Sequence, residues 1–321
     1  MKAIEVEGEN LVWREIDPQD VGPGEVRIKI AATAINRADL VQRSGGYPPP
    51  PGASHVMGLE CAGVVAEVGE GVKRVAVGDE VCALLAGGGY AEETVVPAGQ
   101  VLKIPKGLSF VEAAAIPEVF ATAYLNLYME AALQKGERVV VHAGASGVGT
   151  AAIQMLKRTG NPCFVTASSD EKISQCVELG ADAGHDRQTG SFLSAVQDWA
   201  DTVDVILDPV GGQYLADNLS ALGLNGRLVL IGLMGGAQSD INLGLLMMKR
   251  LRVIGSTLRA RPISEKAAVM DALARDVWPG FEDGSIKPII EATFPIENTN
   301  EAHALVAGNQ TVGKVVLEVE S

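Results

Sequence analysis

The strongest pattern of apolar positions lies in the middle of the chain, at residues 138–154. Val139, Val140 and Val141 form a β-branched run without charge, as expected of a parallel strand that is buried on both faces. A turn of small residues follows, and an alanine-rich helical pattern comes after it. The order predicts a strand, a tight turn and a helix.

The residues before this stretch have a β-rich pattern up to about position 115. Polar and apolar residues alternate at 26–30, a β-rich run covers 61–68, and a further run at 80–85 follows a Gly-Asp turn. Glycine and proline interrupt these runs at short intervals, which is typical of strands joined by turns. Four successive prolines at 48–51 cannot lie inside a sheet, so they form an ordered rim or a mobile loop.

From about residue 110 the pattern changes to helices that alternate with short apolar strands. Strands are predicted at 163–167, 203–207, 227–231 and 251–255. This alternation predicts an α/β fold with a parallel, doubly wound sheet. The chain returns to β at 289 and 314–319, so we expect one domain from 1–115 with 288–321, and a second domain from 116–287.

The glycine turn suggests a phosphate site. Gly144, Gly147 and Gly149 have no side chains, so a diphosphate could approach the backbone and the positive end of the following helix. Their order is G-x-x-G-x-G, whereas the dinucleotide fingerprint is G-x-G-x-x-G. A tight strand-to-helix turn without a ligand therefore stays open.

Composition narrows the classes of function. The chain has 321 residues, 47% hydrophobic and 21% charged, as in a globular protein with two domains. Its net charge of −14 and its 4% aromatic content disfavour nucleic acid as a partner. No apolar stretch is long enough to span a membrane, and the N-terminus lacks a signal-peptide pattern, so we expect a cytoplasmic protein. The four cysteines are scattered and are expected to be reduced core thiols.

Several motifs resemble one known family along the whole chain. They lie at 34–40, 50–52, 58–60, 78–79, 113–117, 142–149, 178–182, 232–236 and 313–316. These runs resemble the zinc-independent quinone oxidoreductases, the zeta-crystallin-like members of the medium-chain dehydrogenase/reductase superfamily, and most of all the branch with the p53-inducible quinone oxidoreductase. The resemblance implies a mostly β GroES-like catalytic domain, a Rossmann NADPH-binding domain with the cofactor cleft between the two, and a homodimer joined through the Rossmann sheets.

The chain departs from the metal-dependent relatives at their zinc ligands. Asn36 stands where those relatives have a cysteine, and Leu59 stands where they have a histidine. Neither side chain supplies the sulfur or imidazole nitrogen that zinc prefers, and the four-cysteine structural-zinc lobe is also missing. We therefore expect no metal. Glu60, without a zinc to accompany, is expected to anchor a loop through hydrogen bonds.

The resemblance assigns one group of residues to the cofactor. Ser168, Ser169 and Lys172 follow the second Rossmann strand and would meet the 2′-phosphate of NADPH, with Arg187 as a second cation. Asp170 keeps NADH as an alternative, because its carboxylate would repel a phosphate. Lys172 could also be an ordinary exposed helix lysine. The remaining cofactor residues are Gly144, Ser146, Gly147, Val148 and Gly149 in the turn, Gly232, Leu233 and Met234 as a cover, and Arg259 near the pyrophosphate.

The nicotinamide end is assigned by the same resemblance to Asn36, Tyr47 and Thr122. From the residues alone, Asn36 could instead cap a turn and Tyr47 could pack on the prolines. For Arg259 and the basic residues around it, protection of an edge strand or a dimer rim is the competing interpretation.

No hydrolytic set of residues can be assembled, whereas hydride transfer needs none. The expected reaction is hydride transfer from NADPH to a quinone or a conjugated carbonyl, with solvent or Tyr47 as the proton source. Reduction of alkenals or enones is a close alternative. An alcohol dehydrogenase and a non-catalytic NADPH-binding protein are alternatives of other kinds.

Overall fold

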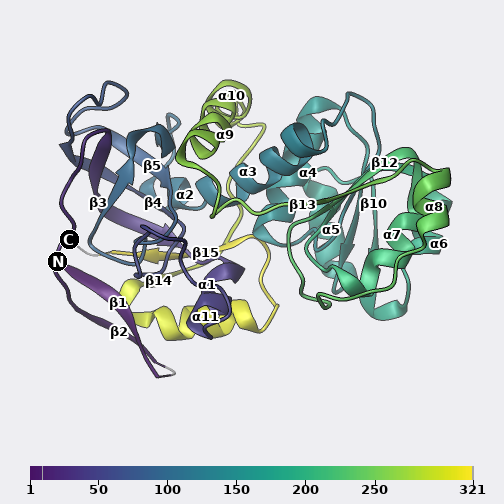
Figure 1. Ribbon diagram of the computed structural model, residues 1–321, viewed down its shortest axis with the longest axis horizontal. Helices are drawn as coiled ribbons and strands as arrows, with labels where there is room; N and C mark the ends of the chain where they lie inside the picture. The colour runs from purple at the N-terminus through teal and green to yellow at the C-terminus, as the bar shows by residue number, and fades with distance from the viewer. Residues whose placement is uncertain (9, 320–321) are drawn as a thin grey trace. The chain divides into compact units, whose positions relative to one another are not determined.

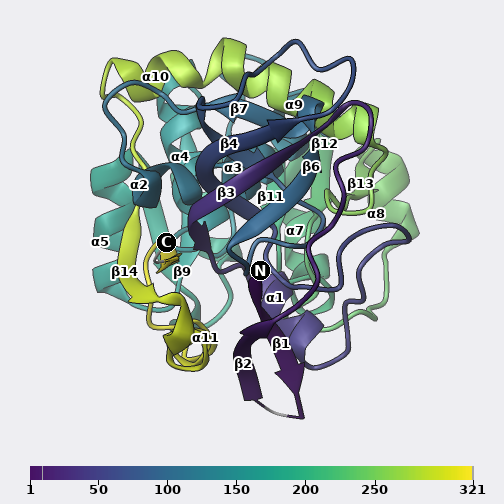
Figure 2. The same ribbon diagram turned by 90° about the vertical axis from the view of Figure 1, so that its left-hand side faces the viewer.

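The computed structural model describes residues 1–8 and 10–319. It divides into two compact units, Met1–Ala121 with Leu258–Ser321, and Thr122–Thr257 (Figure 1). Residues 258–287 were predicted to belong to the second domain, whereas they belong to the first unit here, as do residues 116–121. The reason is their packing: α9 (Ile263–Asp276) and α10 (Trp278–Glu282) lie beside β7 (Figure 2), and Trp278 Nε1 donates to the Lys103 carbonyl at 2.9 Å.

The second unit is built on a six-stranded parallel sheet, which confirms the predicted doubly wound α/β fold. Its strand order is β10-β9-β8-β11-β12-β13. The order reverses between β8 and β11, and ligands of such sheets bind beyond the carboxyl ends of the strands at this point. The strands are β8 (Val139–Val141), β9 (Cys163–Ala167), β10 (Ala183–Asp186), β11 (Val203–Asp208), β12 (Leu222–Leu230) and β13 (Arg252–Gly255).

The helices of this unit pack in two groups, α4 with α5, and α6 and α8 with α7 (Figure 1). Val140 and Ile206 point to the side of α6 and α7, where they join Val196 and Leu219 in one apolar cluster. Gly160 has a left-handed backbone and closes α4, the helix that was predicted after the glycine turn. The helices are α4 (Gly147–Thr159), α5 (Asp170–Leu179), α6 (Leu193–Trp199), α7 (Leu215–Ala221) and α8 (Leu243–Met248), with the π-helical turn η2 (Leu125–Glu130) and the 3₁₀ turns η3 (Arg187–Thr189) and η4 (Gly212–Tyr214).

The first unit is mostly β, as predicted. Its sheet has the order β14-β15-β3-β4-β5-β7, with β6 also paired to β3, and β1 and β2 form a separate antiparallel pair. Strands β14 and β15 come from the C-terminal segment, so the predicted return of the chain to β is confirmed. The strands are β1 (Lys2–Glu7), β2 (Asn10–Glu15), β3 (Glu25–Ala34), β4 (Glu60–Val68), β5 (Glu80–Leu84), β6 (Glu93–Pro97), β7 (Val101–Lys103), β14 (Ile290–Pro295) and β15 (Lys314–Glu318).

The first unit also contains helices, of which α1 packs beside α11 and α2 contacts β3, β4 and β5. They are α1 (Arg37–Arg43), α2 (Phe110–Ala114), α3 (Pro117–Tyr124), α9, α10 and α11 (Thr299–Ala307), with the 3₁₀ turns η1 (Ala98–Gln100) and η5 (Ile296–Asn298). None of the helices in the described part of the chain has the length and apolar character that crossing a membrane requires.

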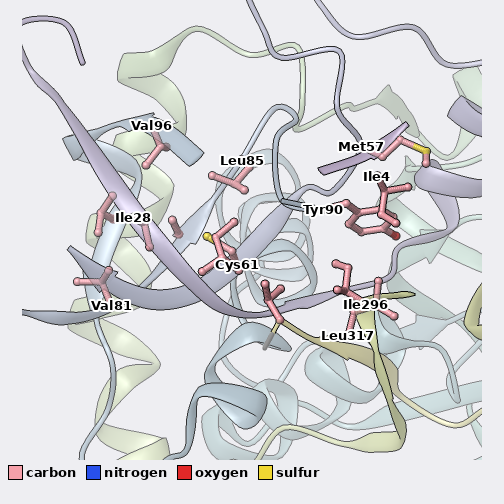
Figure 3. Close-up of a cluster of buried hydrophobic side chains, with 14 of the residues drawn as sticks. Ile4, Ile28, Met57, Cys61, Val81, Leu85, Tyr90, Val96, Ile296 and Leu317 are labelled. Carbon is pink, nitrogen blue, oxygen red and sulfur yellow. The ribbon is translucent and has the colours of Figure 1, made fainter. Parts of the chain in front are cut away.

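The core of the first unit is an apolar cluster with one polar member at its edge. Figure 3 shows Ile28, Cys61 and Val81 within this cluster, and Tyr90 beside Ile4. The phenol of Tyr90 is fully buried, so its hydroxyl needs partners inside the protein. All four cysteines are buried free thiols, as the sequence predicted.

Candidate functional site

The glycine turn joins β8 to α4 and is packed tightly on itself. A Cβ added to Gly149 would lie 2.4 Å from the Gly144 carbonyl oxygen, and one added to Gly144 would lie 2.7 Å from Val165 Cβ. Ser146 caps α4 by accepting a hydrogen bond from the Gly149 N–H at 3.1 Å. The local packing therefore demands glycine at 144 and 149, and the turn presents the N-terminus of a 13-residue helix at the reversal point of the sheet.

A series of buried hydrogen bonds connects the strands that end next to this turn. His142 Nε2 lies 2.7 Å from Asn218 Oδ1, and His142 Nδ1 lies 3.0 Å from Thr166 Oγ1. Asn218 in turn donates to Asp208 at 2.9 Å. Burial lowers the pKa of His142, so the imidazole is neutral. Its Nε2 carries the proton, because the partner atom Asn218 Oδ1 is an acceptor. These hydrogen bonds tie together the ends of β8, β9 and β11, and they were not predicted from the sequence.

The residues predicted for the 2′-phosphate lie together at the ends of β9 and β10. Ser169 caps α5 by accepting from the Lys172 N–H at 3.3 Å. Gln188 donates to the Ser168 carbonyl at 2.7 Å, which holds η3, and with it the exposed Arg187, beside Ser168. Lys172 is half-buried on α5.

The loop after β12 carries the residues that were predicted to cover the cofactor. Gly232, Leu233 and Met234 lie beside the loop after β11, where the Met234 N–H donates to the Pro209 carbonyl at 3.2 Å. The side chains of Leu233 and Met234 are 56% and 55% exposed, which is unusual for large apolar residues.

The first unit contains a buried ionic cluster around Asn36. Lys314 Nζ lies 2.7 Å from each of three oxygens, the Ile35 carbonyl, Asn36 Oδ1 and Glu60 Oε1. Asn36 Nδ2 donates to Glu60 Oε1 at 2.9 Å and to the Ala34 carbonyl at 3.3 Å. The side-chain N–H groups of Asn36 are therefore engaged within the protein, and Asn36 also begins α1, the capping position that the sequence left open.

Glu60 connects this cluster to α3. Its side chain is fully buried, and Oε2 accepts a hydrogen bond from the Glu118 N–H at 2.9 Å. A carboxylate at a helix N-terminus is favoured by the free N–H groups and the helix dipole. The anchoring role predicted for Glu60 is confirmed, although the anchored element is the start of a helix.

A second set of buried polar groups adjoins Asn36 on α1. Asp39 accepts from the Asn36 N–H at 2.8 Å and from the Tyr90 hydroxyl at 3.0 Å, and that hydroxyl lies 3.1 Å from His303 Nε2. Burial raises the pKa of Asp39 to about 6 and lowers the pKa of His303 to about 4. The partners of Tyr90 that its burial requires are thus Asp39 and His303.

Tyr47 lies against Arg259, which is only 3% exposed. The guanidinium is 5.1 Å from the centre of the Tyr47 ring, donates to the Tyr47 carbonyl at 3.2 Å and donates to the Ala86 carbonyl at 2.8 Å. Lys266 donates to the Arg259 carbonyl at 3.2 Å. Tyr47 thus packs on a cation in addition to lying in its proline-rich loop.

Glu118, at the start of α3, was not among the residues predicted for the site. Its carboxyl oxygen Oε2 is buried without a hydrogen-bond partner. Burial and the charge of Glu60 raise the pKa of Glu118 to about 8, so the carboxyl is mostly neutral near pH 7. Thr122, predicted for the nicotinamide end, follows Glu118 by one turn of α3, so the two share a helix face.

The residues at the expected zinc position do not fit a zinc ion. Leu59 is apolar and 1% exposed, and the ammonium of Lys314 already contacts the oxygens of Asn36 and Glu60. A zinc site needs three or four sulfur, imidazole or carboxylate ligands. Within residues 1–8 and 10–319, no group of three or more His, Cys, Asp or Glu is arranged to hold a metal.

Two models of known protein families match this chain, one in each of its two predicted domains. A family model described as an alcohol dehydrogenase GroES-like domain matches residues 22–106, and one described as a zinc-binding dehydrogenase matches residues 147–275. Quinone oxidoreductase-like protein 2 from Bos taurus is 31% identical over 313 residues, which cover 97% of this chain and 89% of that protein. The chain belongs to the medium-chain dehydrogenase/reductase superfamily.

Solved structures of this superfamily have the same fold over nearly the whole chain. The quinone oxidoreductase of Escherichia coli, solved as a complex with NADPH, is 27% identical with a TM-score of 0.86, and covers 99% of this chain and 98% of its own. The JamJ enoyl reductase is 26% identical with a TM-score of 0.88, and covers 99% of each chain. The predicted resemblance and the predicted pairing of a GroES-like domain with a Rossmann sheet are confirmed.

Proposed function

We propose that this medium-chain dehydrogenase/reductase uses NADPH to reduce a quinone or a similarly conjugated carbonyl without a catalytic metal. The observation that carries the proposal is the Lys314 ammonium, which binds the oxygens of Asn36 and Glu60 at 2.7 Å. An alcohol dehydrogenase needs an electrophile, usually a metal ion, that stabilises the alkoxide. The oxygens of Asn36 and Glu60 already contact an ammonium and do not form a metal site. A quinone is electron-poor enough to accept hydride without one.

NADPH would be held by the second unit. The glycine turn and the N-terminus of α4 suit its pyrophosphate, and Ser168, Lys172 and Arg187 suit its 2′-phosphate. The NADPH complex of the Escherichia coli relative supports this assignment. When bound, the reduced nicotinamide supplies the hydride. Asp170, at the start of α5 and exposed, is the reason to measure NADH beside NADPH.

The acceptor end would include Tyr47 and the region around Asn36 in the first unit, and Thr122 keeps the nicotinamide role that the resemblance assigns to it. Because Asn36 Nδ2 already donates to Glu60 and Ala34, we assign Asn36 mainly to positioning. Burial raises the pKa of Tyr47, so its hydroxyl stays neutral and can donate a hydrogen bond to an acceptor oxygen.

Reduction of enones or alkenals is the second candidate, and the similarity to the JamJ enoyl reductase favours it. Both reactions add a hydride to a conjugated system and differ in the acceptor. A matrix of NADPH and NADH against quinones, enones and simple alcohols tests them together. Turnover with quinones supports the proposal, turnover with enones alone supports the alternative, and cofactor binding without any turnover leaves a non-catalytic NADPH-binding protein.

We also propose a homodimer joined through β13, the edge strand of the Rossmann sheet. Val253 on β13 is 37% exposed, and Met247 and Met248 on the adjacent α8 are 71% and 74% exposed. An exposed strand edge with apolar neighbours invites pairing with a second copy. Light scattering should give a dimer mass for the wild type and a monomer mass for Val253→Pro, and a monomeric wild type contradicts this arrangement.

A further inference from the structure

Five buried polar side-chain atoms in the described part of the first unit lack a hydrogen-bond partner, and two of them belong to charged side chains that influence each other. One is Oε2 of Glu118, at the start of α3, and the other is Nη2 of Arg259. Buried polar groups are nearly always paired, and an unpaired one costs about 1–3 kcal/mol, more if it is charged. Two such atoms on side chains that influence each other electrostatically suggest that a ligand completes them.

The two side chains are close enough to affect each other electrostatically. The positive charge of Arg259 counteracts the rise in the pKa of Glu118, and both side chains influence the pKa of the Tyr47 hydroxyl. Arg259 also lies over the Tyr47 ring and donates a hydrogen bond to the Tyr47 carbonyl, so the guanidinium and the Tyr47 loop hold each other in place.

The titratable groups that interact electrostatically with Glu118 come from several elements. They are Glu60 on β4, Lys314 on β15, Asp39 on α1, Arg259 after β13, Lys266 on α9 and Tyr47 after α1. The negative charge of Glu60 is offset by its direct contact with the Lys314 ammonium. Arg259 and Lys266 remain as buried cations that donate hydrogen bonds to the Ala86, Tyr47 and Arg259 carbonyl groups. With Glu118 neutral, the region favours a ligand atom that carries negative charge.

We propose that Arg259 and Glu118 bind the carbonyl oxygen of the acceptor, Arg259 stabilising the negative charge that develops there and Glu118 supplying the proton. This inference rests on the proposed function and names its acceptor-oxygen site. Glu118 replaces solvent or Tyr47 as the proton source, and Tyr47 orients Arg259 through its ring and its carbonyl.

The chemical step balances without a further reactant. Addition of a hydride to the acceptor breaks a π bond and leaves an electron pair on the carbonyl oxygen. The O–H bond of Glu118 then breaks, its proton goes to that oxygen, and the bonding pair stays on the carboxylate, which water reprotonates. The acceptor gains two electrons and the nicotinamide loses two.

The first test is Glu118→Gln, with Glu297→Gln as control because Glu297 is exposed on η5. A lost general acid lowers kcat by roughly 10²- to 10⁴-fold. We expect that loss with an unchanged KM for NADPH, and we expect the decline of wild-type kcat above pH 8, set by the Glu118 pKa of about 8, to disappear in the variant. Wild-type kcat and an unchanged pH profile in Glu118→Gln would overturn the role of Glu118.

The second test needs no turnover. The apoprotein is titrated with 4-nitrophenol, whose visible absorbance reports its phenolate form, as a probe for a charged acceptor oxygen. The wild type should bind it and favour the phenolate, and Arg259→Met should weaken binding by about 10-fold or more, the equivalent of one hydrogen bond to a charged group. Arg261→Met is the control, because Arg261 pairs with Glu265 at the surface. Equal binding by wild type and Arg259→Met overturns the site.

The two tests separate this inference from the proposed function. An active wild type with unaffected Glu118 and Arg259 variants removes the inference and keeps the function. A wild type that reduces no acceptor, but whose phenolate binding depends on Arg259, removes the function and keeps the oxyanion site.

Discussion

The substitution Lys314→Met removes the buried cation of the first unit and keeps a side chain of similar length. Lys314 is 4% exposed, and its ammonium contacts the fully buried carboxylate of Glu60, the Asn36 amide and the Ile35 carbonyl. Methionine replaces none of these contacts. Glu60 would then be an uncompensated buried charge beside Glu118 and Asp39.

The cost follows from the loss of one partner of a buried ion pair, which is about 3–5 kcal/mol. Three hydrogen bonds to a charged group could sum to more, but they share one ammonium and are not additive. The double variant Lys314→Met with Glu60→Gln removes both charges and keeps one acceptor oxygen at residue 60, so one of the two hydrogen bonds from the Asn36 amide and the Glu118 N–H remains. It should therefore recover about 1–3 kcal/mol relative to the sum of the single variants.

Hydrogen exchange followed by mass spectrometry measures this effect within the first unit, which matters because a two-unit chain does not unfold in one step. The opening free energies of β4 and β15 should fall in Lys314→Met. The control is Lys29→Met, since Lys29 is exposed on β3 and should change stability by no more than about 0.5 kcal/mol. If Lys314→Met costs no more than Lys29→Met, the ammonium is not the cation that stabilises this cluster.

Three further predictions address the cofactor residues and the pH dependence of stability. Lys172→Ala should raise the KM for NADPH by about 10- to 100-fold and leave the KM for NADH unchanged, with Lys106→Ala as control; an unchanged preference for NADPH removes Lys172 from the phosphate site. Gly149→Ala should weaken NADPH binding by at least about 10-fold in a fluorescence titration, since its Cβ would lie 2.4 Å from a carbonyl oxygen, while Gly308→Ala should bind normally; equal affinities refute the tight-turn argument. Because folding raises the pKa of Glu118 from its ordinary 4.5 to about 8, the folded state binds more protons between these values and stability falls as pH rises through them. The opening free energies of the first unit, measured by hydrogen exchange from pH 6.5 to 8, should show this loss in the wild type and less of it in Glu118→Gln, which retains Asp39 and the histidines, and parallel curves would contradict the buried, neutral carboxyl.

The sequence predicted the parallel sheet because its strands are continuous β-branched runs. It missed β10, whose residues Ala183–Asp186 are short, partly polar and only half-buried. It also assigned α9 and α10 to the wrong neighbours from their position in the chain, since helical periodicity does not tell which sheet a helix packs against.

Residues of the candidate site were predicted from the sequence only where they belong to a recognisable motif. The glycine turn and the serines after β9 were proposed as cofactor residues because their backbone chemistry is local, and this assignment stays a prediction. Lys314 was not assigned a role, although a lysine within the apolar run 314–319 was a visible signal that a buried partner exists. Glu118 and Arg259 become notable only through burial and missing partners, which depend on residues far apart in the sequence.

The most direct test of the proposed function is quinone-dependent oxidation of NADPH by protein that has been dialysed against a chelator and measured for metal content. We predict turnover that is unchanged by dialysis, with less than one metal ion per chain and no oxidation of simple alcohols. Turnover that disappears on dialysis and returns with zinc would contradict the account, because it would require a metal site that Asn36, Leu59 and the Lys314–Glu60 pair do not provide.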